Sequence, residues 1–236
     1  SNGNDSYVKF PANQYVAYID KLRWTMDEET FVLGNKIASS EGSEFVSVHP
    51  TQDSLRFFAK TAFYSLKDYI IYANGVDNIE VADAIIYIDS GIVTVAKEAV
   101  IQTLYGAKII ADVHTFTNAA VDLISSNKYT ASGDYAYTDA MNQKQQIFFK
   151  EIRVNDDTIT VARGDVKTEK PFHIDSKFDF KGSLNLFANR NNLTFDGYFM
   201  ANHTCSLIEK EWVKFRSEID PKNILFTLDE KLYNDE

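Results

Sequence analysis

The chain has 236 residues, of which 44% are hydrophobic and 14% aromatic, and its formal net charge is −10 at pH 7. This length and composition fit a folded globular protein with a sizeable core and exclude a disordered chain. Basic residues form no uninterrupted cluster. Because a polyanion meets a repulsive average field, DNA, RNA and anionic membrane surfaces are poor candidate partners.

Cys205 is the only cysteine, which excludes an intrachain disulfide and a multi-cysteine zinc site. We expect Cys205 to be a small buried hydrophobe, as free cysteines usually are. The sequence contains no run of about 18 apolar residues and no signal peptide, which predicts no membrane span. It begins at Ser1 rather than Met. We therefore expect it to be part of a larger protein whose export signal lies upstream.

The main secondary-structure signal is alternation of apolar and polar residues with a period of two, which is typical of half-buried strands. In chain order it predicts strands over residues 7–10, 31–33, 55–63, 68–72, 79–85, 92–95, 129–137, 146–154, 158–162, 178–186 and 193–199. The clearest is 178–186, which places four apolar residues on one face: Phe178, Phe180, Leu184 and Leu186.

Turn residues separate many of these segments, as in Asn74-Gly75, Ser132-Gly133 and Asp196-Gly197. Helices are at best minor. The leading helix candidate is 208–218, because Ile208, Trp212 and Phe215 follow the i, i+4, i+7 spacing of one helix face. A strand over 212–215 is the competing interpretation.

A weak internal repeat is one interpretation of three segments that end on glycine, namely 62–75, 120–133 and 183–197. Each contains an apolar stretch, a polar interruption, and an aromatic residue or alanine two positions before the glycine. Their spacing hints at a unit of about 30 residues, of the kind that stacked β architectures use. Chance similarity among strands and turns explains the pattern equally well.

Residues 58–76, FAKTAFYSLKDYIIYANGV, followed by 79–87, IEVADAIIY, resemble the repeat of the lipopolysaccharide-transport and organic-solvent-tolerance family. Members of that family alternate an A-x-x-A-x-Y strand, a turn, and a strand that ends in G-x-V. The cadence of residues 24–27, 52–55, 81–84 and 180–182 is also similar to that of large exported proteins of the Bacteroidetes.

The resemblance implies an open jelly roll or solenoid of stacked strands, an exported or cell-envelope location, and carriage of an amphipathic lipid along an apolar groove. The chain departs from the family in its irregular glycine spacing and in later segments that lose the G-x-V ending. These departures count against lipid carriage, because a carrier needs one continuous groove. The negative charge also opposes binding of a phosphorylated glycolipid.

Residues that could carry chemistry are scattered along the chain. The four histidines lie far apart in sequence: His49, His114, His173 and His203. His203 and Cys205 are two residues apart, so in a strand they share a face and could touch one metal ion or pair as base and nucleophile. A metal ion would need further ligands, and a thiolate would need a stabilising site. We identify no catalytic, cofactor-binding or metal-binding residue.

Carboxylates flank several of the predicted strands: Asp83, Asp89, Asp112, Asp134 and Asp139. Turn capping is the main interpretation, and calcium binding between loops is the alternative.

Exposed aromatic rings could stack on sugars, and the candidates are Tyr64, Tyr69, Tyr72, Tyr135, Tyr137, Trp24 and Trp212. Core or cross-strand packing is the main interpretation of each.

The sequence therefore predicts an all-β fold, either a β-solenoid or an open β-jelly-roll of stacked antiparallel strands, with at most one or two short helices. We expect one continuous β domain over residues 1–236, with a possible subdivision into 1–115 and 116–236. The predicted function is a non-enzymatic structural or interaction module of an exported or cell-envelope protein, without cofactors. Its partners would be other domains of the parent protein, or a second copy joined by edge strands. The alternatives are a periplasmic carrier of an amphipathic lipid and a glycan-binding or glycan-cleaving module.

Overall fold

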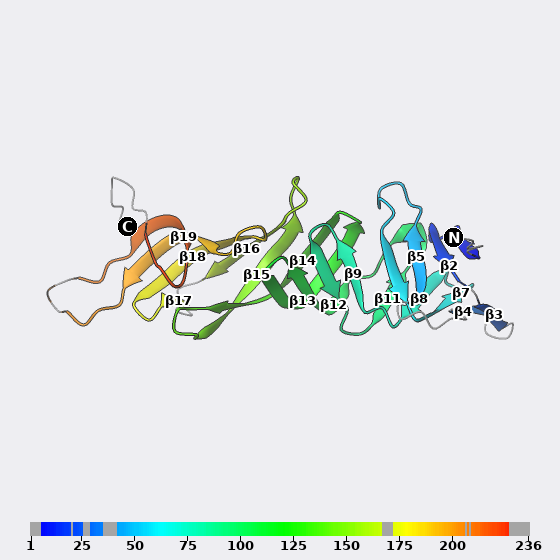
Figure 1. Ribbon diagram of the computed structural model, residues 1–236, viewed down its shortest axis with the longest axis horizontal. Helices are drawn as coiled ribbons and strands as arrows, with labels where there is room; N and C mark the ends of the chain where they lie inside the picture. Colours follow the sequence, from blue (N-terminus) through cyan, green and yellow to red (C-terminus); the bar gives the residue numbers. More distant parts are fainter. Residues whose placement is uncertain are drawn as a thin grey trace.

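The computed structural model describes residues 6–19, 21–25, 29–34, 42–166, 172–205, 207 and 209–226. The ribbon is elongated, with β1–β8 at one end and β17–β20 at the other (Figure 1). The fold is all-β, as the sequence predicts, and a 3-10 turn at Lys97–Ala99 is the only helical element in the described part. No helix within it has the length and apolar character needed to cross a membrane.

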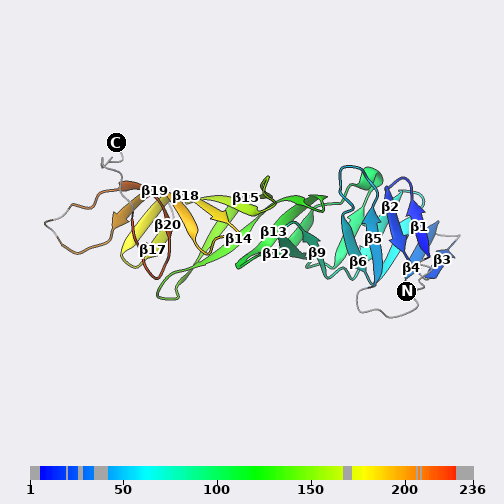
Figure 2. The ribbon, with the colours of Figure 1, turned by 45° about the horizontal axis from the view of Figure 1, so that its top comes forward.

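Two small antiparallel sheets face each other at the N-terminal end (Figure 2). The first has the order β1-β2-β5-β6, with bounds Tyr7–Phe10, Tyr15–Tyr18, Ser43–Ser47 and Arg56–Ala59. The second has the order β11-β8-β7-β4-β3, with bounds Ile92–Val95, Ile70–Asn74, Thr61–Ser65, Thr30–Gly34 and Lys21–Thr25. Their inner faces meet where the ring centroids of Phe10 and Tyr64 lie 4.9 Å apart.

The chain builds this sandwich by placing successive hairpins in alternate sheets. Asn13, in the β1–β2 turn, ties the two sheets together. Its buried side-chain amide donates hydrogen bonds to the carbonyl oxygens of Tyr69, at 2.8 Å, and Val95, at 2.9 Å. One side chain thus satisfies two backbone acceptors of the opposite sheet, and a buried acceptor left without a donor is costly.

Asn13→Ala is expected to lower the free energy of unfolding by about 3 kcal/mol, because both carbonyl oxygens lose their donor. Urea unfolding measures this change. Asn202→Ala is the matched control, since the exposed Asn202 side chain accepts a hydrogen bond from the exposed Lys210 ammonium, and its effect should stay below about 0.5 kcal/mol. Equal effects of the two substitutions would contradict the role assigned to Asn13.

The remaining strands form one long antiparallel sheet, in which β9 lies beside β6 of the sandwich. Its first strands are β9 (Asn78–Val81), β10 (Ala84–Tyr87), β12 (Leu104–Ala111), β13 (His114–Ser125), β14 (Lys128–Thr138) and β15 (Lys144–Val154). It continues with β16 (Thr160–Val166), β17 (Phe172–Asp175), β18 (Phe178–Phe187), β19 (Leu193–Ala201) and β20 (Val213–Ile219). The strands follow one another in chain order, so the sheet is a meander, with two interruptions: β11, between β10 and β12, belongs to the second sandwich sheet, and β17 pairs with β18 off the main path.

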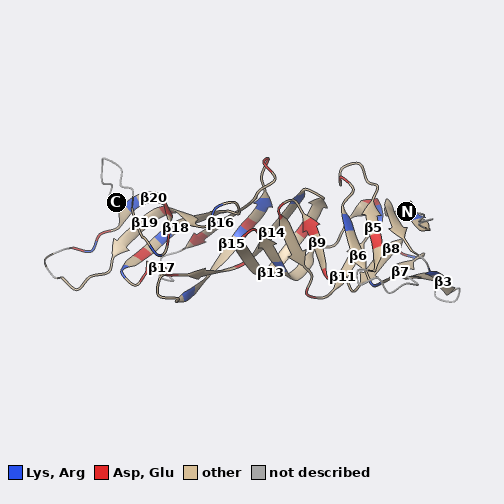
Figure 3. Cartoon of the chain, viewed as in Figure 1, with Lys and Arg blue, Asp and Glu red and all other residues tan. Residues whose placement is uncertain are grey.

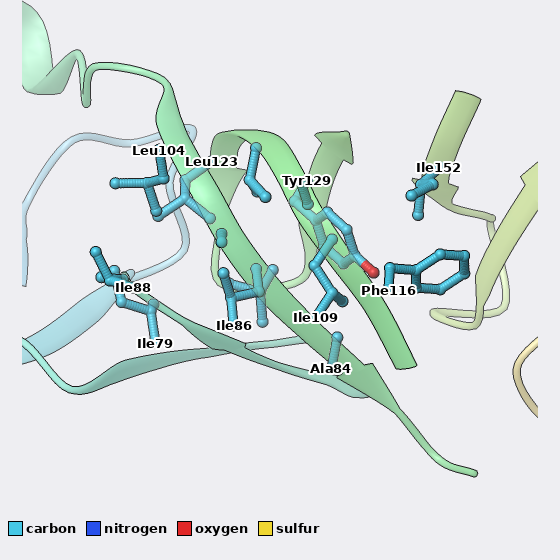
Figure 4. Close-up of a cluster of buried hydrophobic side chains, with 14 of the residues drawn as sticks. Ile79, Ala84, Ile86, Ile88, Leu104, Ile109, Phe116, Leu123, Tyr129 and Ile152 are labelled. Atoms are coloured by element: carbon cyan, nitrogen blue, oxygen red, sulfur yellow. The ribbon is translucent and has the colours of Figure 1, made fainter. Parts of the chain in front are cut away.

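The hydrophobic core connects buried side chains from Phe10 in β1 to Ile219 in β20. Figure 4 shows its middle part, where Ile86 and Ile109 on paired strands lie toward Phe116 and Tyr129.

The long sheet also curls back on itself. The Asp83 carboxylate, in the β9–β10 turn, accepts hydrogen bonds from the backbone N–H and the hydroxyl of Thr160 in β16. The subdivision at residues 115/116 falls within β13.

Two predicted strands are each two strands in the structure. The predicted strand 55–63 breaks at Lys60 into β6 and β7, which belong to different sheets. The predicted strand 79–85 contains the β9–β10 turn at Ala82, whose φ is 53°. In both cases the buried positions switch from odd to even numbers at the break, because the chain reverses or crosses between layers there.

The helix predicted over 208–218 is wrong where the structure describes it, because Val213–Ile219 is the strand β20. Ile208 lies outside the described residues. The predicted strand 158–162 begins later, at Thr160, because Thr158 has a φ of 60° in the preceding turn. The three segments of the suggested repeat are the hairpins β7–β8, β13–β14 and β18–β19.

Candidate functional site

The inner face of the second sandwich sheet consists of two rows of side chains that run across all five strands. Cross-strand pairing gives the first row as Leu22, Leu33, Ala62, Ala73 and Val93. The second row is Trp24, Phe31, Tyr64, Ile71 and Val95. Both rows begin on the edge strand β3 and continue into the core.

Burial along these rows stops abruptly at β3. Leu33 is 1% exposed, whereas its cross-strand neighbour Leu22 is 48% exposed. Trp24 is 56% exposed, although Tyr64 in the same row is buried. Leu22 and Trp24 are thus apolar residues in line with the core rows, but they are exposed and the core residues are buried. We call Leu22, Trp24 and Phe31 the β3 rim.

The β3 rim combines exposed apolar side chains with an unpaired backbone edge. Its apolar part is ordered by packing, because the Trp24 ring stacks on Phe31 with centroids 5.8 Å apart and an interplanar angle of 29°. Its backbone part is the outer edge of β3, which pairs with no other strand in the described part of the chain. An exposed edge with an apolar face is a template for a further strand.

The aromatic residues that the sequence suggested as sugar-stacking groups are dispersed. Tyr64 and Tyr137 are core residues, and Tyr135 is half-buried with rings of Phe116 and Phe149 against it. Burial raises the pKa of the Tyr64, Tyr135 and Tyr137 hydroxyls above the usual range. Core packing is the correct interpretation for these three.

The exposed Tyr69 and the half-buried Tyr72 and Trp212 have ring contacts of their own. The ammonium groups of Lys97 and Lys181 lie 4.4 Å and 4.6 Å from the ring centroids of Tyr69 and Trp212. Tyr72 stacks on Phe63 at 4.5 Å between centroids. These contacts compete with a sugar for the same faces. Among the candidates, Trp24 belongs to the β3 rim.

The structure does not bring His203 and Cys205 together on the face of a strand. Residues 202–205 form no strand, so the shared strand face does not exist. Cys205 is exposed, which contradicts the expected buried position. The other histidines have local partners: His49 contacts Thr51, His114 contacts Tyr135, and His173 contacts Asp179.

The five aspartates that flank predicted strands do not form one site in the structure. Asp139 caps its turn, because its carboxylate accepts hydrogen bonds from the backbone N–H groups of Met141 and Gln143. Asp83 instead reaches across the sheet to Thr160, and Asp134 accepts a hydrogen bond from Asn118. Asp89 and Asp112 are exposed. Among the described residues, no group of three or more His, Cys, Asp or Glu side chains could hold a metal ion.

Comparisons of the chain with family models, curated proteins and solved structures return no match. The class of protein defined by the fold is an open, elongated, all-β protein with unpaired edge strands. The resemblance to the lipopolysaccharide-transport family stays a prediction.

Proposed function

We propose that the protein is a non-enzymatic structural module that assembles through the edge of β3, where two copies join their second sandwich sheets. The observation that carries the proposal is the break in burial between Leu33 and Leu22. A core row that ends on an exposed edge strand is completed when another strand continues it. The proposal extends the stacked-strand arrangement of a solenoid or open jelly roll across two chains.

A symmetric antiparallel pairing of β3 with itself fits the residue pattern. With Arg23 at the twofold axis, Leu22 of each copy lies opposite Trp24 of the other, on the inner face. The two rows of each sheet then continue into the partner, and the rim side chains become cross-strand neighbours. Symmetric dimers of this kind are the commonest homo-oligomers.

Electrostatic repulsion between the two copies opposes this pairing, so the dimer should depend on the salt concentration. Each copy carries a net charge of −10, and the pairing places Arg23 opposite its own copy on the outer face. Like charges directly opposite each other destabilise a sheet. Added salt screens both repulsions, so association should strengthen as the salt concentration rises.

The experiment is sedimentation equilibrium at protein concentrations up to about 1 mM, which detects a dissociation constant on the order of 0.1 mM. The wild type should form a dimer and Trp24→Lys should stay monomeric. Arg23→Thr should tighten the dimer by about threefold, because it removes the like-charge pair. Tyr105→Lys is the control, since Tyr105 is 73% exposed on β12, outside the rim.

A monomeric wild type over the whole concentration range would overturn the proposal. So would equal dimerisation of wild type and Trp24→Lys, because the rim would then not be the contact. Loss of the dimer in Tyr105→Lys would point to a different surface.

Lipid carriage and glycan binding by aromatic stacking find less support in the geometry. A lipid carrier needs an open apolar groove, whereas the inward side chains of the described strands, apart from those of the edge strand β3, pack into one buried cluster. A module that binds glycans by stacking them on aromatic rings needs free ring faces, and those of Tyr69, Trp212 and Tyr72 contact other side chains. An exported or cell-envelope location is part of our proposal and rests on the sequence resemblance alone.

A further inference from the structure

Arginine is concentrated on one face of the C-terminal half of the protein. Six arginines occur in the sequence, and four of them line two adjoining surface depressions of about 430 Å³ each: Arg153, Arg163, Arg190 and Arg216. These arginines are far apart in the sequence, and folding brings them onto one face together with carboxylates. Basic and acidic residues alternate over these strands in Figure 3.

The two depressions have matching compositions. Arg153, Arg163 and Glu151 line the first, over β15 and β16. Arg190, Arg216 and Glu218 line the second, over the β18–β19 turn and β20. Asn185 and Phe187 of β18 belong to both and form the boundary between them. Each depression therefore offers two guanidinium groups and one carboxylate.

A row of polar side chains crosses the outer face and links the two depressions. Strand register gives the order Glu151, Arg163, Asn185, Thr194 and Glu218. Arg163 forms no ion pair with a described residue. Arg153 pairs with Glu151, Arg190 with Glu218, and Arg216 with Asp196. The ion-paired side chains are about half exposed or more, so these pairs are weak and exchangeable.

The turn that carries Arg190 is fixed by a hydrogen bond to a buried side chain. The carbonyl oxygen of Arg190 accepts a 2.6 Å hydrogen bond from Nε2 of the buried His114. Because a carbonyl can only accept, Nε2 carries the proton, and Nδ1 then accepts from the Tyr135 hydroxyl at 3.1 Å. The guanidinium of Arg190 lies over the Phe187 ring, 4.7 Å from its centroid. The turn is therefore preorganised.

We propose that this face binds an acidic oligosaccharide, with one sugar carboxylate in each depression. Guanidinium groups match carboxylates in planar, paired hydrogen bonds, and two similar depressions suit a polymer that carries one carboxylate per sugar. The Asn185 amide, the Thr194 hydroxyl and the Glu151 and Glu218 carboxylates lie between and beside the arginines, where they can bond sugar hydroxyls.

The experiment is calorimetric titration of the full chain with tetragalacturonate, and with its methyl ester as the neutral counterpart. The wild type should bind the acid in a saturable, salt-sensitive manner and bind the ester at least about tenfold more weakly. Arg163→Gln and Arg190→Gln should each weaken binding of the acid by about tenfold. Unchanged melting temperatures will show that the variants are folded.

Arg56→Gln is the matched control, because Arg56 is an exposed, ion-paired arginine of β6, on the N-terminal sandwich. Its binding should equal that of the wild type. No saturable binding, equal binding of the ester, or equal loss in Arg56→Gln would overturn the proposal. Pentaglutamate is the second probe, and binding as tight as that of the sugar would assign the face to acidic peptides and reject the oligosaccharide.

Discussion

Phe149→Ala is expected to lower the free energy of unfolding by about 4 kcal/mol, which is typical of removing a fully buried phenylalanine side chain. Phe149 is 0% exposed at the centre of β15. Its ring meets those of Phe116 and Tyr135 edge-on, at centroid distances of 5.7 Å and 5.8 Å. Truncation removes both contacts and leaves a cavity that the close-packed sheet cannot fill. Urea unfolding followed by circular dichroism measures the loss.

The neighbouring residue provides the control. Phe148 precedes Phe149 on the same strand but points to the opposite face, where it is 57% exposed. Phe148→Ala should change the free energy of unfolding by less than about 1 kcal/mol. Equal effects of the two substitutions would contradict the assignment of the inner face.

Gly197→Ala is expected to destabilise the C-terminal part of the long sheet by about 3 kcal/mol, because an added methyl group meets the backbone. Gly197 of β19 pairs directly with Gly182 of β18. A Cβ atom at position 197 would lie 2.3 Å from the carbonyl oxygen of Lys181 and 2.7 Å from Cα of Gly182. The two strands must separate to admit it, which breaks the ladder between them.

Gly34→Ala is the control for this substitution. Gly34 ends β4, and a Cβ atom there would meet no atom within 4 Å. Alanine in a strand loses less conformational entropy than glycine, so stability should be unchanged or rise by up to about 1 kcal/mol. Thermal melting compares the two variants. A stable Gly197→Ala protein would show that the glycine pair is not needed for close approach.

Strands with uninterrupted alternation could be predicted from the sequence. Residues 92–95 and 178–186 match β11 and most of β18. Alternation does not show the strand bounds where its phase changes. β13 was not predicted, because Asn118, with a φ of 51°, interrupts its pattern at a bulge. Where the chain crosses between sheets, as at Lys60, the sequence shows a phase change but not the sheet to which each strand belongs.

The candidate site was less predictable than the fold. Trp24 was among the aromatic candidates, but the sequence alone cannot show that its neighbours in the sheet are buried and that it is not. Leu22 gives no separate signal, and the sequence analysis predicts no strand over Lys21–Thr25 although its polar and apolar residues alternate. The arginine face depends on register between strands that are distant in sequence, and that register was unknown.

Residue-resolved hydrogen exchange at low and high protein concentration tests the central claim most directly. If two copies join through β3, the amides of Lys21–Thr25 will exchange more slowly in the concentrated sample. The amides of β20, Val213–Ile219, the edge strand at the C-terminal end of the long sheet, will exchange at the same rate in both samples. Unchanged exchange in β3, or slowing confined to β20, would contradict the proposal.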